Sequence, residues 1–110
     1  MTFGALALAG PASAQAIPPV TCNAYTGLFF QGGTASAPVL VADSYYTCTN
    51  GTTKPSSDVI YIVRTLSNGS VQSVKSGTGQ VEYVCGGITT TYTYSADNVP
   101  GTNPITLACN

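Results

Sequence analysis

Charge is the scarcest property of this sequence. Three residues are Lys or Arg and four are Asp or Glu, so 6% of the chain is charged, against about 25% in an average soluble domain. Three basic side chains are too few to line a groove for nucleic acid or to hold the chain on an anionic membrane surface. Because 44% of the residues are hydrophobic, the composition also differs from that of disordered chains, which combine low hydrophobicity with high charge.

Histidine is absent, which removes the commonest general base and the commonest metal ligand. The four acidic residues are isolated from one another, so we interpret them as solubility residues at strand ends and turns and not as catalytic pairs. The glycine pairs lack the Lys-Ser or Lys-Thr sequel of a phosphate-binding loop. We therefore expect a protein that is not an enzyme and that uses no metal or cofactor. The acidic residues are Asp43, Asp58, Glu82 and Asp97.

The first sixteen residues have the pattern of an export signal. An apolar run from Phe3 to Ala9 is followed by Gly10-Pro11 and by Ala14-Gln15-Ala16, which places small residues where signal peptidase cleaves. The run is too short to span a bilayer, which takes about 20 apolar residues. Signal peptides begin with Lys or Arg, which this segment lacks. The alternatives are a truncated signal peptide over residues 1–16 and a retained apolar arm that a neighbour's sheet could accept as a strand.

Four cysteines, all within residues 17–110, indicate two structural disulfides in an exported chain. Three pairings are open. We favour the sequential one, which closes two local loops of similar size, over the nested one, which would tie the two ends of the domain together. Without histidine or a C-x-x-C pair, a zinc site is not expected. The cysteines are Cys22, Cys48, Cys85 and Cys109.

Strand-forming residues recur along residues 17–110, separated by turn residues, and no window has helical periodicity. The sequence predicts seven strands in a single domain. Seven short strands with frequent turns are typical of an antiparallel β-sandwich of immunoglobulin-like architecture, with a small β-barrel as the alternative. The predicted strands are Val20–Phe30, Pro38–Thr49, Asp58–Ser67, Ser70–Ser76, Gln80–Cys85, Ile88–Ala96 and Ile105–Cys109.

Two short patterns refine this interpretation. Tyr46-Thr47-Cys48 and Tyr83-Val84-Cys85 have the Y-x-C order of immunoglobulin domains, but the chain has no tryptophan for the core. We therefore expect the sandwich architecture and not that family. Asn68-Gly69 predicts a two-residue type I′ hairpin with Leu66 opposite Val71 and Val63 opposite Val74. It also forms an N-x-S/T glycosylation sequon, as does Asn50-Gly51-Thr52, and in both cases we favour the turn over the glycan.

The strand Asp58–Ser67 is apolar on both of its faces. Either a loop covers its outer face, or that face is a contact surface for a ligand or another subunit. Tyr92 and Tyr94 alternate with threonines and could extend this surface, because tyrosine is enriched at interfaces. The candidate contact surface is Val59, Tyr61, Val63, Tyr92 and Tyr94.

The low charge leads to the expected function. Sheet edges without charged residues are poorly protected against pairing with other strands, which suits a subunit that assembles with copies of itself. We expect an exported, extracellular or cell-surface structural protein without a membrane span. The alternative is a secreted, monomeric binding module that recognises an extracellular protein or a small ligand through loops on its rigid scaffold.

Overall fold

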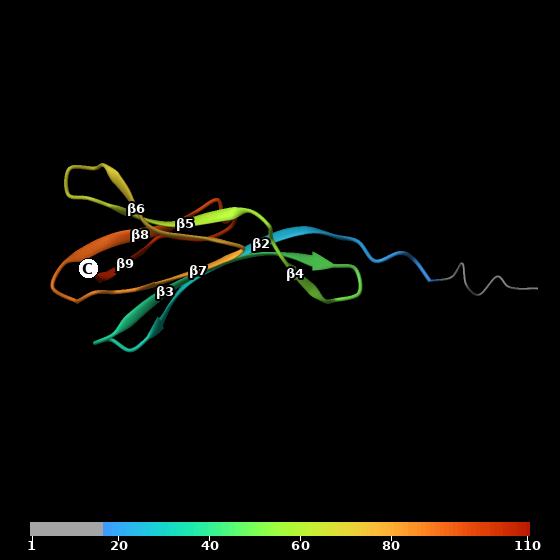
Figure 1. The fold of residues 1–110 in the computed structure, drawn as a ribbon, viewed down its shortest axis with the longest axis horizontal. Helices are drawn as coiled ribbons and strands as arrows, with labels where there is room; N and C mark the ends of the chain where they lie inside the picture. The colour runs from blue at the N-terminus through green and yellow to red at the C-terminus, as the bar shows by residue number, and fades with distance from the viewer. Residues whose placement is uncertain (1–16) are drawn as a thin grey trace, which may run out of the picture.

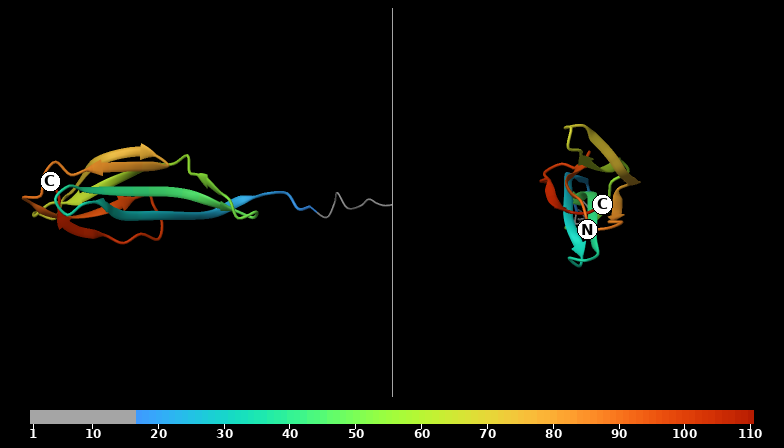
Figure 2. Two further views of the ribbon diagram at one scale, coloured as in Figure 1. Left: turned by 90° about the horizontal axis from the view of Figure 1, so that it is seen from below. Right: turned by 90° about the vertical axis from the view of Figure 1, so that its left-hand side faces the viewer.

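Figure 1 shows the computed structural model, which describes residues 17–110; the expected export signal over residues 1–16 lies outside them. The described chain is mostly strand, has no helix, and forms two antiparallel sheets. The sheets face each other, and within residues 17–110 neither closes into a barrel (Figure 2). The predicted disulfide-stapled β-sandwich is therefore confirmed, and the barrel alternative is wrong.

The first sheet is built around β3 (Pro38–Cys48). One side of β3 pairs along its whole length with β2 (Cys22–Gly33), where Leu28 lies opposite Asp43 and Phe30 opposite Val41. The other side is shared by β7 (Gln80–Val84) and the short strand β4 (Thr53–Pro55). This central place agrees with the sequence of β3, whose run of aliphatic residues is mostly buried.

The second sheet has the order β6 (Val71–Thr78), β5 (Val59–Thr65), β8 (Thr91–Asp97) and β9 (Ile105–Ala108). Side chains alternate between the faces of a strand, and the apolar residues of β5 and β8 that point inward meet those of β3 and β7. The resulting core is small. Its buried members are Leu40, Ala42, Ile60, Ile62, Val81, Tyr94, Val99 and Cys109.

The chain passes from the second sheet to the first at Gly79, the single residue between β6 and β7. Gly79 has a φ of 73°, and a Cβ atom on it would lie 2.5 Å from the carbonyl oxygen of Ser56. Its N–H donates to Asp58, and its carbonyl accepts from the N–H of Ser44 at 2.8 Å. Only glycine fits this crossing, because other residues disfavour the positive φ and their side chain would strike the backbone.

The disulfides pair Cys22 with Cys48 and Cys85 with Cys109, which confirms the favoured sequential connectivity. The first joins the neighbouring strands β2 and β3 within one sheet. The second joins the residue after β7 to the residue after β9, and so links the two sheets. Only the second therefore opposes separation of the two layers directly.

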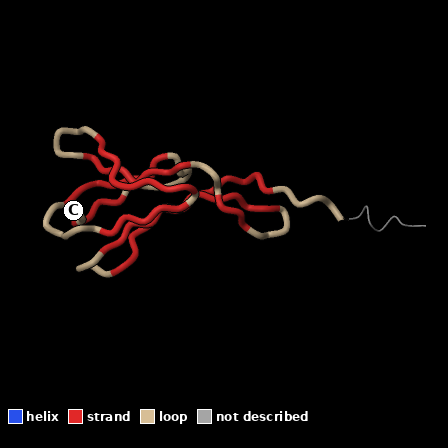
Figure 3. The backbone as a smooth tube through the Cα atoms, viewed as in Figure 1, coloured by secondary structure: helices blue, strands red, loops and turns tan. Residues whose placement is uncertain are grey.

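The described residues form eight strands, one more than predicted, and Figure 3 shows their course along the chain. The additional strand is β4, which we predicted as part of the loop Asn50–Ser57. It has only three residues, all exposed, and includes Lys54 and Pro55. Its composition is that of a loop, and it forms a strand because the turn after Cys48 returns the chain beside β3, where Lys54 pairs with Tyr46.

The hairpin between β5 and β6 forms, but its predicted register is wrong by one residue. Val71 lies opposite Thr65 and not Leu66. The loop has three residues, because Leu66 N–H donates to Ser70 at 2.8 Å and Gly69 N–H donates to Leu66 at 2.9 Å. A type I′ turn needs a positive φ at both central residues, and of the Asn-Gly pair only Gly69 has one.

The side chain of Asn68 explains this turn. Its Oδ1 atom accepts from the N–H of Ser70 at 3.0 Å and from the Ser70 hydroxyl at 2.6 Å, a local bond that competes with the type I′ conformation. Asn50 makes the same two contacts with Thr52. The same one-residue shift places Ser73, and not the predicted Val74, opposite Val63. A bulge follows between Val63 and Ile62, so that Ile62 lies opposite Lys75.

Candidate functional site

The outer face of β5 is exposed. Ile60 and Ile62 point inward and are fully buried, whereas Val59 is 46% exposed and Tyr61 38% exposed. Val63 is half-buried on the same outer side. The alternative that a loop covers this face is therefore wrong, and the predicted Val59, Tyr61 and Val63 do lie together on one exposed side of a strand.

Strand pairing extends this exposed side into a larger surface, which we call the Tyr61 face. Tyr61 lies between Ser76 of β6 and Asp97 of β8. Most of the other positions bear small hydroxyl or aliphatic groups, and the hydroxyls of Thr93 and Thr106 hydrogen-bond to each other at 2.8 Å. The Tyr61 face comprises Val59, Tyr61, Val63, Thr65, Val71, Ser73, Ser76, Thr93, Ser95, Asp97 and Thr106.

Tyr92 and Tyr94 are not part of this face, which corrects our prediction. They lie on β8 beside β5, as expected, but they point to the opposite side of the sheet, with the core. Tyr94 is 0% exposed and Tyr92 is half-buried. Alternation with threonine is equally consistent with either side facing solvent, so the pattern identified the strand and not the direction of its aromatic residues.

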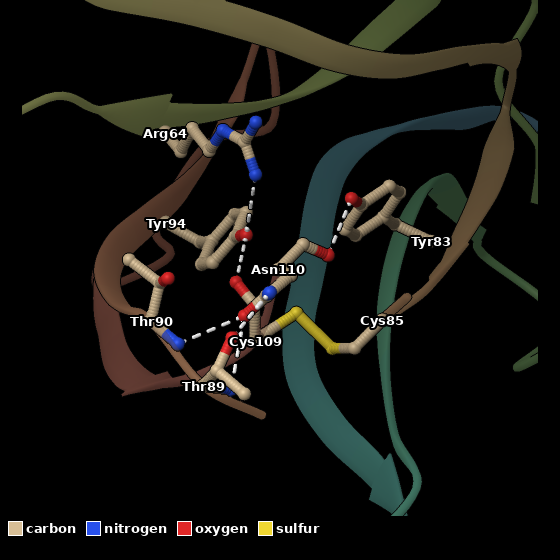
Figure 4. Close-up of a disulfide and its surroundings, with 8 residues drawn as sticks. All are labelled: Arg64, Tyr83, Cys85, Thr89, Thr90, Tyr94, Cys109 and Asn110. Atoms are coloured by element: carbon tan, nitrogen blue, oxygen red, sulfur yellow. Dashed lines mark hydrogen bonds between the residues drawn. A yellow bond between two sulfur atoms is a disulfide. The ribbon is translucent and has the colours of Figure 1, made fainter. Parts of the chain in front are cut away.

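Tyr94 is held in a small polar cluster inside the sandwich (Figure 4). Its hydroxyl donates to the carbonyl oxygen of Cys109 and accepts from Nη1 of Arg64 at 3.3 Å. The Arg64 guanidinium also lies 4.5 Å above the ring of Tyr92. Burial raises the pKa of Tyr94, and the hydrogen bond with Tyr94 raises the pKa of Arg64. Both shifts favour the protonated forms, in which Arg64 donates to the Tyr94 hydroxyl and Tyr94 donates to Cys109.

Asn110 fastens the segment after Cys85 to the last strand. Its Oδ1 atom accepts from the N–H groups of Thr89 and Thr90, and its carbonyl accepts from the Tyr83 hydroxyl at 2.7 Å. Figure 4 shows these bonds around the Cys85–Cys109 disulfide. These hydrogen bonds of Asn110 therefore connect the two sheets near the disulfide.

Shallow grooves lie on the surface of residues 17–110. One, of about 560 Å³, is at the end of β5 and β8 that carries the Asn68-Gly69 turn. Two others, of about 410 Å³ each, lie beside Ser44 and beside Asn98. Hydroxyl groups dominate the lining of the first groove, which consists of Thr65, Leu66, Ser67, Asn68, Thr90, Thr91, Tyr92, Thr93 and Thr106.

The acidic residues are placed as structural or solvent-facing groups. Asp58 accepts a hydrogen bond from the Tyr25 hydroxyl at 2.9 Å, which fastens β2 to the start of β5. Asp43 is half-buried on β3, and Glu82 and Asp97 are exposed. Within residues 17–110, no group of three or more His, Cys, Asp or Glu side chains is arranged to hold a metal ion.

A second exposed apolar surface, which we did not predict, lies on the outer side of the first sheet. Leu28 is 46% and Phe30 45% exposed on β2, and Val84 is exposed on β7. The signal was present in the run Leu28-Phe29-Phe30, which is apolar at every position although a strand with one solvated face should alternate. We had read this run as the end of an ordinary strand.

No family model, curated protein or solved structure matches this chain. Residues 17–110 contain no helix with the length and apolar character needed to cross a membrane.

Proposed function

We propose that this chain is an exported, non-catalytic β-sandwich that serves as a structural subunit of an extracellular fibre or surface layer. The observation that carries the proposal is the Tyr61 face. It presents Val59, Tyr61 and Val71 to solvent on one side of a four-stranded sheet, with Asp97 as its charged member. Exposed apolar groups gathered on a sheet mark interaction sites more often than isolated ones do.

The disulfides support the extracellular part of the proposal. All four cysteines are paired, and structural disulfides persist in oxidising compartments outside the cytosol. They also suit a subunit with a small core, since cross-links stabilise the fold without requiring a larger buried area.

The experiment is to measure the association state of the oxidised chain by sedimentation velocity and negative-stain microscopy. We expect ordered assemblies for the unmodified chain. Tyr61→Lys should disrupt them, because it places a charge in the contact. It should leave a species no larger than a dimer by sedimentation velocity, folded by circular dichroism. The matched control is Thr53→Lys, which adds the same charge at an exposed position of β4, in the other sheet. An unmodified chain that is monomeric at all concentrations contradicts the proposal.

The second candidate is a secreted binding module, and the groove of about 560 Å³ favours it. Its lining of threonine, serine and asparagine, with Tyr92 beside them, offers hydroxyl and amide groups to a small polar ligand. This candidate predicts a stable monomer. Substitutions in the groove, such as Thr91→Ala, would then reduce ligand binding, whereas Tyr61→Lys would leave it unchanged.

A further inference from the structure

The longest strand, β2, lies at a sheet edge and lacks charge, proline and, from Ala24 to Gly33, any bulge. The loop after β8 packs against it at Gly27, where a Cβ atom would lie 2.9 Å from the carbonyl oxygen of Pro100, and the rest of the edge toward Gly33 is the part considered below. It has twelve residues, Cys22–Gly33, and among residues 17–110 it pairs with β3 alone. Its sequence contains no charged residue and no proline. Its one irregularity is a register shift between Cys22 and Ala24, so the ladder is regular from Ala24 to Gly33. An edge of this kind is a template for pairing with another strand.

The other edges of the two sheets are protected. β4 has three residues, including Lys54 and Pro55, and β7 has five, with Glu82 in the middle. β6 carries Lys75 next to its bulge. β9 has four residues and follows Pro104. Short length, charge, proline and bulges are the devices by which natural sheets prevent edge pairing, so their absence is specific to β2.

The hydrogen bonds of β3 show which groups of β2 face the free edge. Ser44 N–H and C=O bond to Gly79 and Ser56, on the side of β3 away from β2. Gly27, which lies opposite Ser44, is therefore in a non-hydrogen-bonded pair, and its own N–H and C=O point outward. Because these pairs alternate, Phe29, Gln31 and Gly33 present their backbone groups at the free edge as well.

The side chains of β2 make this edge complementary to itself. Leu28 and Phe30 are exposed on the outer face, two residues apart and on either side of Phe29. When two copies of β2 pair antiparallel about a two-fold axis at Phe29, Leu28 of one copy lies opposite Phe30 of the other. This occurs twice. In the same register Gly27 and Gln31 form hydrogen-bonded pairs, and both exposed apolar residues of each copy are covered.

We propose that β2 pairs with β2 of a second copy of this chain, antiparallel and centred on Phe29, to form one continuous sheet across a dimer. A second copy fits because an uncharged strand meets itself without like-charge repulsion, and because the register brings the four exposed apolar side chains, Leu28 and Phe30 of each copy, into cross-strand contact. In Figure 2 the end of the β2–β3 hairpin projects beyond the neighbouring strands, so another molecule can reach it.

This inference rests on the proposed assembly function and adds a second contact to it. A two-fold contact closes on itself and yields only a dimer. A fibre or layer needs another interface on each subunit, and the Tyr61 face, which belongs to the other sheet, supplies it. Dimers formed through β2 would then be joined through their Tyr61 faces.

The first test removes one edge donor without touching the β2–β3 ladder. Gln31→Pro deletes an N–H that points to the free edge, and proline is tolerated at such positions. We expect it to weaken dimerisation by about tenfold or more, since each unpaired edge group loses a hydrogen bond on association. Gln31→Ala keeps the N–H and should dimerise as the unmodified chain does. Sedimentation velocity measures both, and circular dichroism checks that each is folded.

The second test determines the register in which the two β2 strands pair. Residues in non-hydrogen-bonded antiparallel pairs have Cα atoms about 4.5 Å apart, within the range that a disulfide bridges. Chains with Leu28→Cys and chains with Phe30→Cys, folded separately and then mixed, should form a covalent dimer under mild oxidation. Neither variant alone should do so, because like positions face each other only diagonally. Cross-linking of Phe30→Cys with itself would overturn the proposed register.

The outcomes separate this inference from the proposed function. If the unmodified chain associates and Gln31→Pro associates equally well, the β2 pairing is wrong and assembly through another surface stands. If Gln31→Pro prevents association but the mixed cysteine variants do not cross-link, the edge accepts another segment, such as a neighbour's N-terminal arm, and the paired β2 strands are wrong. If the unmodified chain is monomeric, both proposals fall.

Discussion

Replacing Tyr94 with phenylalanine tests whether the buried polar cluster holds the two sheets together. The substitution removes one oxygen atom, which is buried and donates to the carbonyl of Cys109, a residue that is also fully buried. That carbonyl is left without its partner, at a cost of about 1–3 kcal/mol. For a domain of this size each kcal/mol lowers the melting temperature by roughly 4–8 °C, so we expect a decrease of roughly 4–24 °C.

The assay is thermal unfolding of the oxidised protein followed by circular dichroism. Tyr61→Phe is the matched control, because it removes the same atom from a tyrosine that is partly exposed on the outer face. Equal melting temperatures for the two variants would refute the assignment of a stabilising role to the Tyr94 hydroxyl. A decrease for Tyr94→Phe alone would show that the sheets depend on this contact as well as on the Cys85–Cys109 disulfide.

Three further predictions concern pH, the sheet crossing and the disulfide between the sheets. Burial raises the pKa of the Tyr94 hydroxyl above its value in the unfolded chain. The stabilisation contributed by this hydroxyl is therefore complete below about pH 10 and is lost as the pH rises through the folded-state pKa. Urea titrations at pH 9 and 11 should show a smaller decrease in the free energy of unfolding for Tyr94→Phe than for the unmodified chain. Gly79→Ala should destabilise the fold by more than the roughly 1–2 kcal/mol of its positive φ alone, because its Cβ would strike Ser56, whereas Gly51→Ala, with open space around it, should cost only that strain; melting temperatures compare them. Replacing Cys85 and Cys109 together with alanine should cost about 3 kcal/mol in the loop-entropy model, as measured by urea unfolding, and an unchanged midpoint would contradict a structural role.

The fold class was predictable because the determining signals are local. Val, Ile, Thr and Tyr runs between Gly, Pro and Asn turns indicate short antiparallel strands, and an even number of cysteines in a short chain indicates disulfides. The disulfide pairing was open on sequence and followed from topology, which brings Cys85 and Cys109 together at the ends of β7 and β9. The strand β4 was not predictable, since nothing in Thr53–Pro55 favours a strand.

The exposure of the candidate surface was predicted in part. That the outer side of β5 is exposed was one of the two alternatives that its two apolar faces left open, and its role as a contact surface stays a prediction. The predicted direction of the Tyr94 side chain was wrong because the side of a strand that is buried depends on the layer against which the strand packs. Residues distant in sequence determine that packing. The predicted hairpin register was wrong because the Asn68 side chain hydrogen-bonds to Ser70. This bond favours a three-residue loop over the two-residue loop that we predicted.

The position of the charges along the chain connects the sequence to the proposed interface. All seven charged residues lie between Asp43 and Asp97. The uncharged sequence before Asp43 includes the start of the central strand β3, where burial explains the absence of charge. It also includes β2 (Cys22–Gly33), which lies at an edge, where charge is a common protection against pairing. β4, β6 and β7 each carry at least one charged residue. The distribution is therefore better explained by an edge that is kept available for a partner than by a general shortage of charge.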